Sequence, residues 1–255
     1  MRILVTGAAS GLGAALTKAW RERGDDVLAT DLGGVSTSPT DQWPLDVTSD
    51  DDWAAAYAEV ERRWGGLDIL VNNAGVAGGG RLDMATLDEW RWITEINLYG
   101  VVRGTRTFVP MLKGQRSGHI VNVASLAGLV HPAGMASYNA VKAAVVALTE
   151  TTGHELAAFG VRASVVCPSY FRTNLLSSMQ GADTALAGVI AQLVESSSLT
   201  ADDIAAAVIE GVDRGDELIV PDQPARDAWA LKQHDRAAYD AVMRAQAAKL
   251  VNTVG

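Results

Sequence analysis

Cysteine is nearly absent from this sequence, and long apolar runs are missing altogether. Cys167 is the only cysteine among 255 residues, so no disulfide forms within the chain, and we expect a small buried thiol near a strand end. No stretch reaches the roughly 18–20 uninterrupted apolar residues that a membrane helix needs. A strand-like run begins at Ile3 and leaves no room for a signal peptide. These absences predict a cytoplasmic protein with no membrane contact.

Positive charge is also scarce. The net charge is −9, the isoelectric point is about 4.9, and no cluster of lysine and arginine appears. This balance argues against nucleic acid as a partner, because such proteins carry a basic patch. The acidic run Asp50–Asp52 follows Ser49, which predicts a helix N-cap with carboxylates in the first turn. No histidines or further carboxylates cluster beside it, so we expect no metal site.

Apolar strand-like segments alternate with helix-like ones along almost the whole chain. The predicted strands cover 2–6, 26–31, 43–47, 67–75 with its following turn, 119–125, 161–168 and 216–221. The predicted helices cover 14–23, 49–64, 86–113 with an interruption near Gly100, and 136–159. This alternation predicts a single-domain α/β Rossmann fold, a doubly wound, seven-stranded parallel sheet with helices on both faces. We assign residues 1–222 to this domain, with a substrate loop at about 170–198, and 223–255 to a C-terminal helical extension.

A glycine-rich turn follows the first strand. In "TGAASGLGAAL" the glycines stand at 7, 11 and 13, and the turn leads directly into a helix, whose N-terminus favours an anion. Asp31 closes the second strand, where Rossmann domains bind the ribose hydroxyls of the adenosine with an acidic residue. A carboxylate there repels a 2′-phosphate, so the pattern predicts NAD(H) as the cofactor in preference to NADP(H).

Tyr138 and Lys142 lie four residues apart in the predicted helix 136–159. This spacing places both side chains on one helix face, one turn apart. A pair of this kind taken alone is more often surface packing than a catalytic site. Its meaning therefore depends on the other motifs of the chain.

Four motifs occur in the order and spacing of one known family. They are the T-G-x-x-x-G-x-G turn (6–13), N-N-A-G (72–75), Ser125 thirteen residues before the tyrosine, and Tyr138-x-x-x-Lys142. In these residues the chain resembles the short-chain dehydrogenase/reductase (SDR) family over about 2–221. The resemblance implies a nicotinamide-dependent oxidoreductase.

The resemblance also assigns roles to the catalytic residues. Tyr138 would be the acid/base, and Lys142 would favour its phenolate and hold the nicotinamide ribose. Ser125 would donate a hydrogen bond to the substrate oxygen. Asn97, which matches a helical asparagine of the family, would hold a water or backbone group in a proton relay behind Lys142.

The expected cofactor site combines the glycine turn and Asp31 with positions that the resemblance implies. Its residues are Gly7, Ser10, Gly11, Leu12, Gly13, Asp31, Asp46, Val47, Asn73, Ala74, Gly75, Tyr138, Lys142, Pro168 and Thr173. The chain departs from the family in two places. Ser169 stands where glycine is usual, and the stretch between Asp31 and Asp46 is too short for the usual helix, so we expect a loop or a single turn there.

The substrate side is expected to be mostly apolar. The expected substrate-binding residues are Ser125, Met135, Tyr138, Tyr170 and Phe171, with Val130, Leu175, Leu176 and Met179 as further candidates. His131 is either a polar contact for the substrate or a loop histidine bonded within the protein. Such a lining suits an apolar small molecule.

These expectations lead to one function and two alternatives. The favoured function is NAD(H)-dependent interconversion of a secondary alcohol and a ketone or aldehyde. The alternatives are a catalytically silent relative that binds dinucleotide as a sensor or partner, and an epimerase or dehydratase. The intact set of catalytic residues argues against the first, and the short chain argues against the second. The resemblance further implies a homodimer or homotetramer formed through the helices at 86–113 and 136–159.

Overall fold

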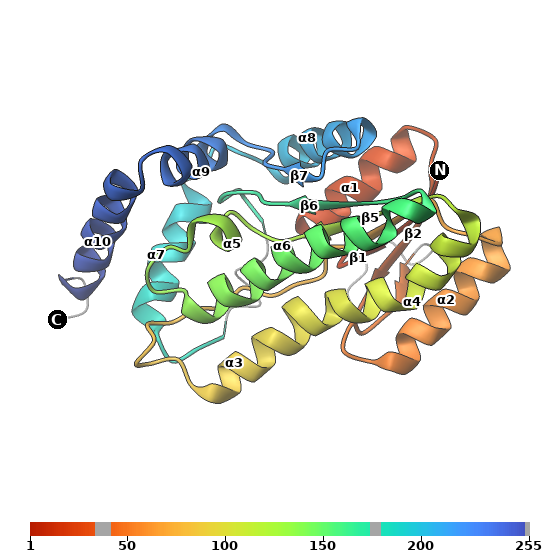
Figure 1. The fold of residues 1–255 in the computed structure, drawn as a ribbon. Helices are drawn as coiled ribbons and strands as arrows, with labels where there is room; N and C mark the ends of the chain where they lie inside the picture. Colours follow the sequence, from red (N-terminus) through yellow and green to blue (C-terminus); the bar gives the residue numbers. More distant parts are fainter. Residues whose placement is uncertain (34–41, 174–179, 253–255) are drawn as a thin grey trace.

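Seven parallel strands form one sheet at the centre of the computed structural model, which describes residues 1–33, 42–173 and 180–252. The strand order is β3–β2–β1–β4–β5–β6–β7, and Figure 1 shows the sheet between two layers of helices. The strands are β1 (Arg2–Thr6), β2 (Asp26–Asp31), β3 (Gln42–Pro44), β4 (Ile69–Asn72), β5 (Gly118–Val123), β6 (Val161–Val166) and β7 (Leu218–Ile219). The predicted doubly wound Rossmann fold is confirmed.

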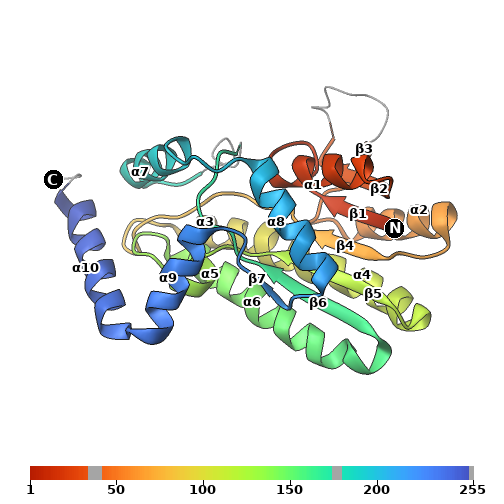
Figure 2. The ribbon, with the colours of Figure 1, turned by 90° about the horizontal axis from the view of Figure 1, so that it is seen from above.

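Alternate side chains of the central strands face opposite helix layers. In β1, Ile3 and Val5 belong to an apolar cluster with helices α1 (Gly11–Glu22) and α8 (Ala201–Arg214). Leu4 points the other way, into a cluster with α2 (Asp50–Trp64) and α4 (Gly100–Gln115). Figure 2, seen from above, places α1 and α8 in front of the sheet. Burial on both faces explains why the strands are almost continuously apolar.

The order of the strands reverses beside β1. The chain runs from β1 outward to β2 and β3, and then returns to place β4 on the other side of β1. At such a switch point the loops after neighbouring strands diverge and leave a crevice at the carboxyl ends of the strands, where open α/β sheets bind ligands. The glycine turn after β1 and the N-N-A-G segment after β4 therefore meet at one edge of the sheet.

Helix α2 begins and ends where its sequence predicts. The side chain of Ser49 accepts a hydrogen bond from the backbone N–H of Asp52, and Gly65 ends the helix with φ 62°. Three aspartates occupy the first turn, where the helix dipole favours negative charge. The N-cap interpretation of this acidic run is confirmed.

The predicted interruption near Gly100 is a change of helix type. α3 (Leu87–Thr94) continues into a π-helical segment, Glu95–Tyr99, which passes directly into α4. Thr86 and Glu89 form a capping box at the start of α3. Asn97 lies buried inside the π-helical segment, and π-turns of this kind often mark functional sites.

The edge strands are shorter than the sequence predicts. β3 ends at Pro44 and does not extend to Val47. Pro44 pairs with Asp31, the last residue of β2, so the ladder has no partner beyond this point. The side chain of Asp46 then accepts hydrogen bonds from the backbone and hydroxyl of Thr48. The loop expected between Asp31 and Asp46 falls largely on 34–41, outside the described residues.

Several helices were not predicted individually. They are α5 (Ala127–Val130), α7 (Thr184–Glu195) and α8, while α6 (Ala136–Leu156) matches the predicted helix and ends in a 3₁₀ turn, Ala157–Phe159. The C-terminal extension is a pair of helices, α9 (Gln223–His234) and α10 (Arg236–Asn252). In Figure 1 this pair lies at the opposite end of the molecule from α2. Within the described residues, no helix has the length and apolar character needed to span a bilayer.

Candidate active site

The glycine turn brings the backbone of α1 close to the end of β1. Gly11 has φ +53°, and a Cβ there would lie 2.6 Å from Oγ1 of Thr173. A Cβ on Gly13 would overlap the carbonyl oxygen of Gly7. The turn therefore needs glycine at both positions, and its N–H groups at the start of α1 suit a diphosphate.

The N-N-A-G segment supports this turn from the neighbouring strand. The amide nitrogen of Asn73 donates hydrogen bonds to the carbonyls of Thr6 (2.8 Å) and Gly7 (3.2 Å). The hydroxyl of Thr6 accepts from the backbone N–H groups of Asn73 and Ala74, each at 3.0 Å. Asn73 is thus a brace for the turn as well as part of the cavity wall.

Asp31 stands at the end of β2 beside the turn. Its carboxylate accepts hydrogen bonds from the backbone N–H of Ala9 (2.9 Å) and of Leu32 (2.8 Å). These contacts fix its orientation at the rim of the cavity.

A cavity of about 1280 Å³ runs along this edge of the sheet. Pockets for a single small ligand commonly measure roughly 300–1,000 Å³, so this one is large enough for a dinucleotide and a substrate together. Its lining includes nearly all the expected cofactor residues: Gly7, Ser10, Gly11, Leu12, Asp31, Asp46, Val47, Asn73, Ala74, Gly75, Tyr138, Lys142, Pro168 and Thr173. Gly13 packs behind the turn instead of lining the cavity.

Ser125, Tyr138 and Lys142 meet in the same cavity. Ser125 follows β5, and the other two lie one turn apart on α6, both buried. The Ser125 hydroxyl accepts a hydrogen bond from the backbone N–H of Ala127 at 3.1 Å and forms another with the phenol of Tyr138. Lys142 Nζ donates to the carbonyl of Val123 (3.0 Å) and lies 5.7 Å from the centre of the Tyr138 ring.

Burial dominates the proton affinities of this pair. It raises the pKa of Tyr138 to about 12, while the hydrogen bond with Ser125 acts in the opposite direction. It lowers the pKa of Lys142 to about 8. Loss of water disfavours the charged form of each group, and this sets the direction of both pKa shifts.

Asn97 lies behind the catalytic pair instead of in the cavity wall. Its side chain accepts a hydrogen bond from the N–H of Val76 (2.8 Å) and donates to the carbonyl of the same residue (3.0 Å). A Cβ on Gly75 would lie 3.0 Å from Asn97 Oδ1 and 3.7 Å from Lys142 Nζ. Gly75 thus leaves room for the amide and the ammonium to approach each other.

Comparisons with known proteins agree with this geometry. The family model for short chain dehydrogenases matches residues 1–183. The chain belongs to the short-chain dehydrogenase/reductase family. A 3-oxoacyl-[acyl-carrier-protein] reductase from Thermotoga maritima is 32% identical over 73% of this chain and 81% of its own. A 3-alpha-(or 20-beta)-hydroxysteroid dehydrogenase from Mycobacterium bovis is 35% identical over 67% and 68%.

Solved SDR structures extend the likeness to the C-terminal helices. An SDR from Burkholderia phymatum in complex with NAD superposes with a TM-score of 0.83 at 28% identity, covering 91% of this chain and 92% of its own. A short-chain dehydrogenase from Streptomyces avermitilis has a TM-score of 0.79 at 31% identity, covering 98% and 97%. Proteins of this family are oxidoreductases that bind a nicotinamide dinucleotide.

The substrate side of this SDR cavity is apolar and covered by α7. Val130, Met135, Tyr170 and Phe171 line it, and the phenol of Tyr170 donates to the sulfur of Met135 at 3.6 Å. From α7, Leu186 and Ile190 pack in one cluster with Met135 and Tyr138. The candidates Leu175, Leu176 and Met179 lie outside the described residues.

Other lining residues were not named from the sequence, although α7 lies within the predicted substrate loop at about 170–198. They are Trp92, Ile96, Leu186, Val189, Ile190, Leu193, Ala228, Met243, Gln246 and Lys249. The α7 members repeat at intervals of three or four residues, so the pattern marks one helix face. The pattern alone does not say what that face covers.

The serine that departs from the family pattern has a partner in this SDR. Ser169 donates to Asp222 through its hydroxyl (2.5 Å) and its backbone N–H (2.9 Å). His131 is bonded within the protein, to the carbonyl of Gly128 (3.1 Å) and to Lys232 Nζ (2.9 Å). The loop-histidine interpretation of His131 therefore holds. Cys167 is fully buried, as expected.

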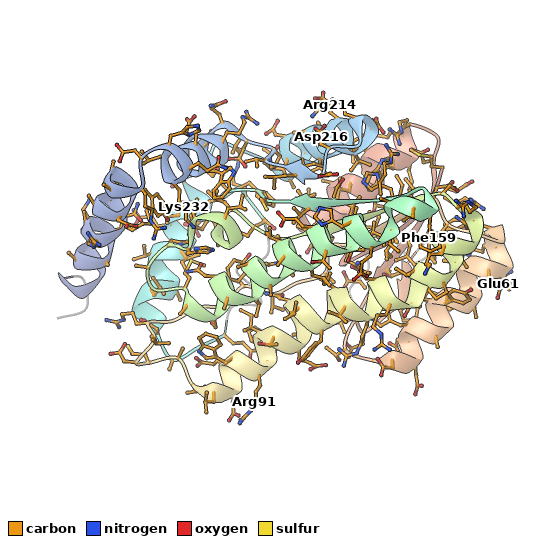
Figure 3. The ribbon with its side chains drawn as sticks, in the orientation of Figure 1. Glu61, Arg91, Phe159, Arg214, Asp216 and Lys232 are labelled. Atoms are coloured by element: carbon orange, nitrogen blue, oxygen red, sulfur yellow. The ribbon has the colours of Figure 1, made fainter. Side chains whose placement is uncertain are left out.

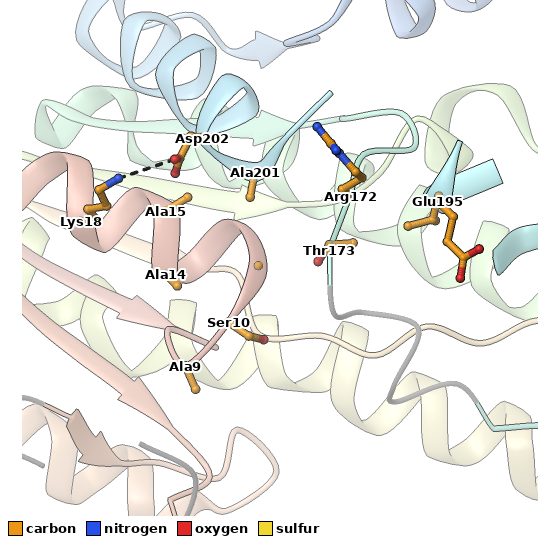
Figure 4. A pocket seen from close by; sticks show the side chains of 12 residues that line it. Ala9, Ser10, Ala14, Ala15, Lys18, Arg172, Thr173, Glu195, Ala201 and Asp202 are labelled. Atoms are coloured by element: carbon orange, nitrogen blue, oxygen red, sulfur yellow. Dashed lines mark ion pairs between the residues drawn. The ribbon is translucent and has the colours of Figure 1, made fainter. Parts of the chain in front are cut away.

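A second pocket, of about 720 Å³, lies on the outer side of the glycine turn. Figure 4 shows it between α1, α8 and Arg172–Thr173, with an ion pair between Lys18 and Asp202 at 3.6 Å. Ser10, Gly11 and Thr173 line both pockets. The turn thus forms a thin wall between the main cavity and this outer pocket.

Proposed function

We propose that this protein is an NAD(H)-dependent oxidoreductase that interconverts a secondary alcohol with a ketone, or a primary alcohol with an aldehyde, on an apolar small molecule. The observation that carries the proposal is the arrangement of Ser125, Tyr138 and Lys142 in one cavity with the glycine turn and Asp31. The residues needed to hold a dinucleotide and those needed to move a proton share one continuous space.

The lining of the cavity offers a group for each part of the cofactor. The turn N–H groups would hold the diphosphate, Asp31 the adenosine ribose, and Lys142 the nicotinamide ribose. Thr173, which lies against Gly11, would bond the carboxamide, as the family resemblance implies. When bound, the cofactor supplies or accepts the hydride.

The protein's own residues would bind the substrate oxygen and transfer the proton to or from it. Ser125 would donate a hydrogen bond to the carbonyl oxygen and hold the adjacent carbon in position. In reduction that carbon gains a hydride and its oxygen gains the phenolic proton of Tyr138, so a ketone becomes a secondary alcohol. Burial raises the pKa of Tyr138, which keeps the phenol protonated and favours its role as an acid.

Lys142 and Asn97 would return the proton that Tyr138 gives up. Lys142 Nζ already donates to the carbonyl of Val123, and its lowered pKa of about 8 makes it able to exchange a proton near neutral pH. Asn97 is held rigidly by Val76. It would position a water or backbone group in the relay.

The preference for NAD(H) rests on Asp31. Its carboxylate is fixed at the cavity rim by Ala9 and Leu32, where it would accept hydrogen bonds from ribose hydroxyls and repel a 2′-phosphate. The NAD-bound Burkholderia phymatum structure supports the same cofactor. The proposal further includes a cytoplasmic homodimer or homotetramer formed through the helices at about 86–113 and 136–159, as the family resemblance implies.

Titration of the purified protein with NADH and with NADPH tests this proposal, followed by the fluorescence of its seven tryptophans. We expect NADH to bind more tightly, and we expect NAD⁺-dependent oxidation of apolar secondary alcohols by the same preparation. Tighter binding of NADPH would contradict the role of Asp31. NADH binding without turnover of any alcohol or ketone would favour the silent relative.

A further inference from the structure

The C-terminal helices are anchored to the two loops that flank the reacting groups. Asp222, which is buried, caps α9 by accepting from the N–H of Ala225 (2.9 Å). The same carboxylate holds Ser169 in the segment after β6. Lys232, on the next turns of α9, donates to the carbonyl of Leu129 in α5. α9 is therefore joined to both the Pro168 side and the α5 side of the cavity.

α10 is fixed to the same short helix. The phenol of Tyr239 donates to the carbonyl of Val130, and its ring is buried. Lys232 also contacts His131 at 2.9 Å, and Figure 3 shows it between α9 and α5. α5 begins two residues after Ser125, so α10 has a defined position relative to the reacting groups.

One face of α10 lines the cavity. Met243, Gln246 and Lys249 recur every third residue, and all three line the same cavity as Ser125 and Tyr138. Positions three apart lie on the same side of a helix. The remaining wall facing the substrate is supplied largely by the apolar side chains of α7.

Polarity rises along this face toward the end of α10. Met243 packs against the apolar cluster that contains Val130, Gln246 is an amide, and Lys249 carries a positive charge. At 1.5 Å per residue, Lys249 lies roughly 9 Å further along the helix than Met243. A ligand lying along α10 would meet hydrocarbon first and a cation last.

The other charged side chains that line the cavity either form ion pairs or belong to the expected cofactor and catalytic sites. Asp31 and Asp46 belong to the adenosine side and Lys142 to the reacting groups. Arg91 pairs with Asp88 at 2.7 Å and Glu95 with Arg103 at 2.6 Å. Lys249 also interacts within the chain, but an ammonium has three donors, so it can hold a ligand in addition.

We propose that α10 recognises the substrate, and that the substrate is an apolar alcohol or ketone with a carboxylate at the end remote from the reacting carbon. Lys249 binds the carboxylate, Gln246 supports it with a hydrogen bond, and Met243 contacts the hydrocarbon between. This inference rests on the proposed function, because it names the substrate class of that same cavity.

Binding of decanoate and of methyl decanoate tests the inference without turnover. Both have the same hydrocarbon chain, and only one is charged. Lys249 is exposed and pairs of exposed charges are weak, so calorimetry on the full-length protein should show decanoate binding roughly two- to fivefold more tightly. Lys249→Gln should remove that difference and leave methyl decanoate unchanged, and Gln246→Ala should reduce it in part.

Lys113→Gln is the matched control, because Lys113 lies on α4 over the ring of Phe159 and does not line the cavity. It should keep the full preference for decanoate. Equal binding of acid and ester to the wild type, or a preference that survives Lys249→Gln, would overturn the inference. Turnover assays separate this inference from the proposed function. If the enzyme reduces neutral ketones with NADH but shows no preference for ketones that carry a carboxylate, the proposed function stands and the role of α10 is rejected.

Discussion

Ser169 and Asp222 connect the cofactor wall to the C-terminal helices through two hydrogen bonds to one buried carboxylate. The hydroxyl of Ser169 lies 2.5 Å from Oδ1 of Asp222 and its backbone nitrogen 2.9 Å from Oδ2. The family pattern has glycine at this position, which could supply the backbone bond but not the side-chain bond. The serine is therefore what strengthens the junction between the segment after β6 and α9.

Ser169→Ala should destabilise this junction. A hydrogen bond to a charged group contributes about 1.5–3 kcal/mol, so urea unfolding should show a loss of roughly 2 kcal/mol, and NADH should bind more weakly. Ser196→Ala is the control, because the hydroxyl of Ser196 is exposed and makes one long bond, of 3.3 Å, to Leu193. An unfolding free energy for Ser169→Ala equal to that of the control would argue that the serine has no such role.

Arg81 and Asp183 hold α7 over the reacting groups. Asp183 has a side chain that is 1% exposed, and it accepts from Arg81 Nε (2.7 Å), Nη2 (3.1 Å) and the backbone N–H (3.0 Å). The same carboxylate caps α7 at Leu186. The ion pair thus positions the helix whose Leu186 and Ile190 cover Tyr138.

Arg81→Gln should raise KM for the substrate several-fold while leaving NADH binding near the wild-type value, because only the substrate wall loses its anchor. Arg81→Lys keeps the charge but not the forked geometry, so its KM should lie between those of the wild type and Arg81→Gln. Steady-state kinetics and the NADH titration separate these effects. Arg214→Gln removes an exposed pair with Asp216 (Figure 3) and serves as the control. A KM unchanged from that control would refute the anchoring role.

Asp31→Ala should weaken NADH binding by roughly tenfold or more, the effect of losing a charge-assisted hydrogen bond. NADPH binding should improve relative to NADH because the repulsion of its 2′-phosphate disappears. Asp26→Ala, at the exposed start of β2, controls for a general change of charge. Fluorescence titration with both cofactors measures the ratio, and an unchanged NADH preference would count against the assignment.

We predict that burial of His119 lowers the free energy of unfolding in mild acid. It is buried in β5, with Nε2 2.7 Å from the hydroxyl of Ser164, and burial lowers its pKa to about 4. An unfolded histidine titrates near 6.5. Between pH 4 and 6.5 the unfolded chain therefore binds the extra proton, so stability falls as pH falls, by up to about 3 kcal/mol from this group.

His119→Gln removes the titrating group and keeps a donor in the side chain. Its free energy of unfolding should decline less steeply than that of the wild type from pH 6.5 to 4, as urea unfolding at several pH values would show. His154→Gln, at an exposed position of α6, should retain the wild-type slope. Parallel slopes for His119→Gln and the wild type would contradict the prediction.

The sequence predicted those parts of the molecule that depend on local pattern. The turn from Gly7 to Gly13, the cap at Ser49 and the spacing of Tyr138 and Lys142 each follow from short-range geometry. The sheet followed from the alternation of apolar strands with helices, and the structure confirms it.

Features that depend on distant contacts were not predictable in this way. The end of β3 at Pro44, the brace made by Asn73 and the partner of Ser169 all involve residues far apart in the chain. The rise in the pKa of Tyr138 through burial was also not predictable, since the depth of a side chain is set by the whole fold. Which face of α10 lines the cavity was also not predictable, because it depends on where α5 and α9 hold this helix.

Single-turnover reduction of a ketone by Tyr138→Phe tests the central claim most directly. The substitution removes only the phenolic oxygen, and a positioned acid/base contributes about 10²–10⁴-fold to rate. We predict that Tyr138→Phe loses rate to that extent while its NADH binding stays intact. The control is Tyr57→Phe, because Tyr57 lies on α2 and packs against Phe108; this variant should reduce the ketone at the wild-type rate. Reduction by Tyr138→Phe at a rate near that of the wild type would contradict the account.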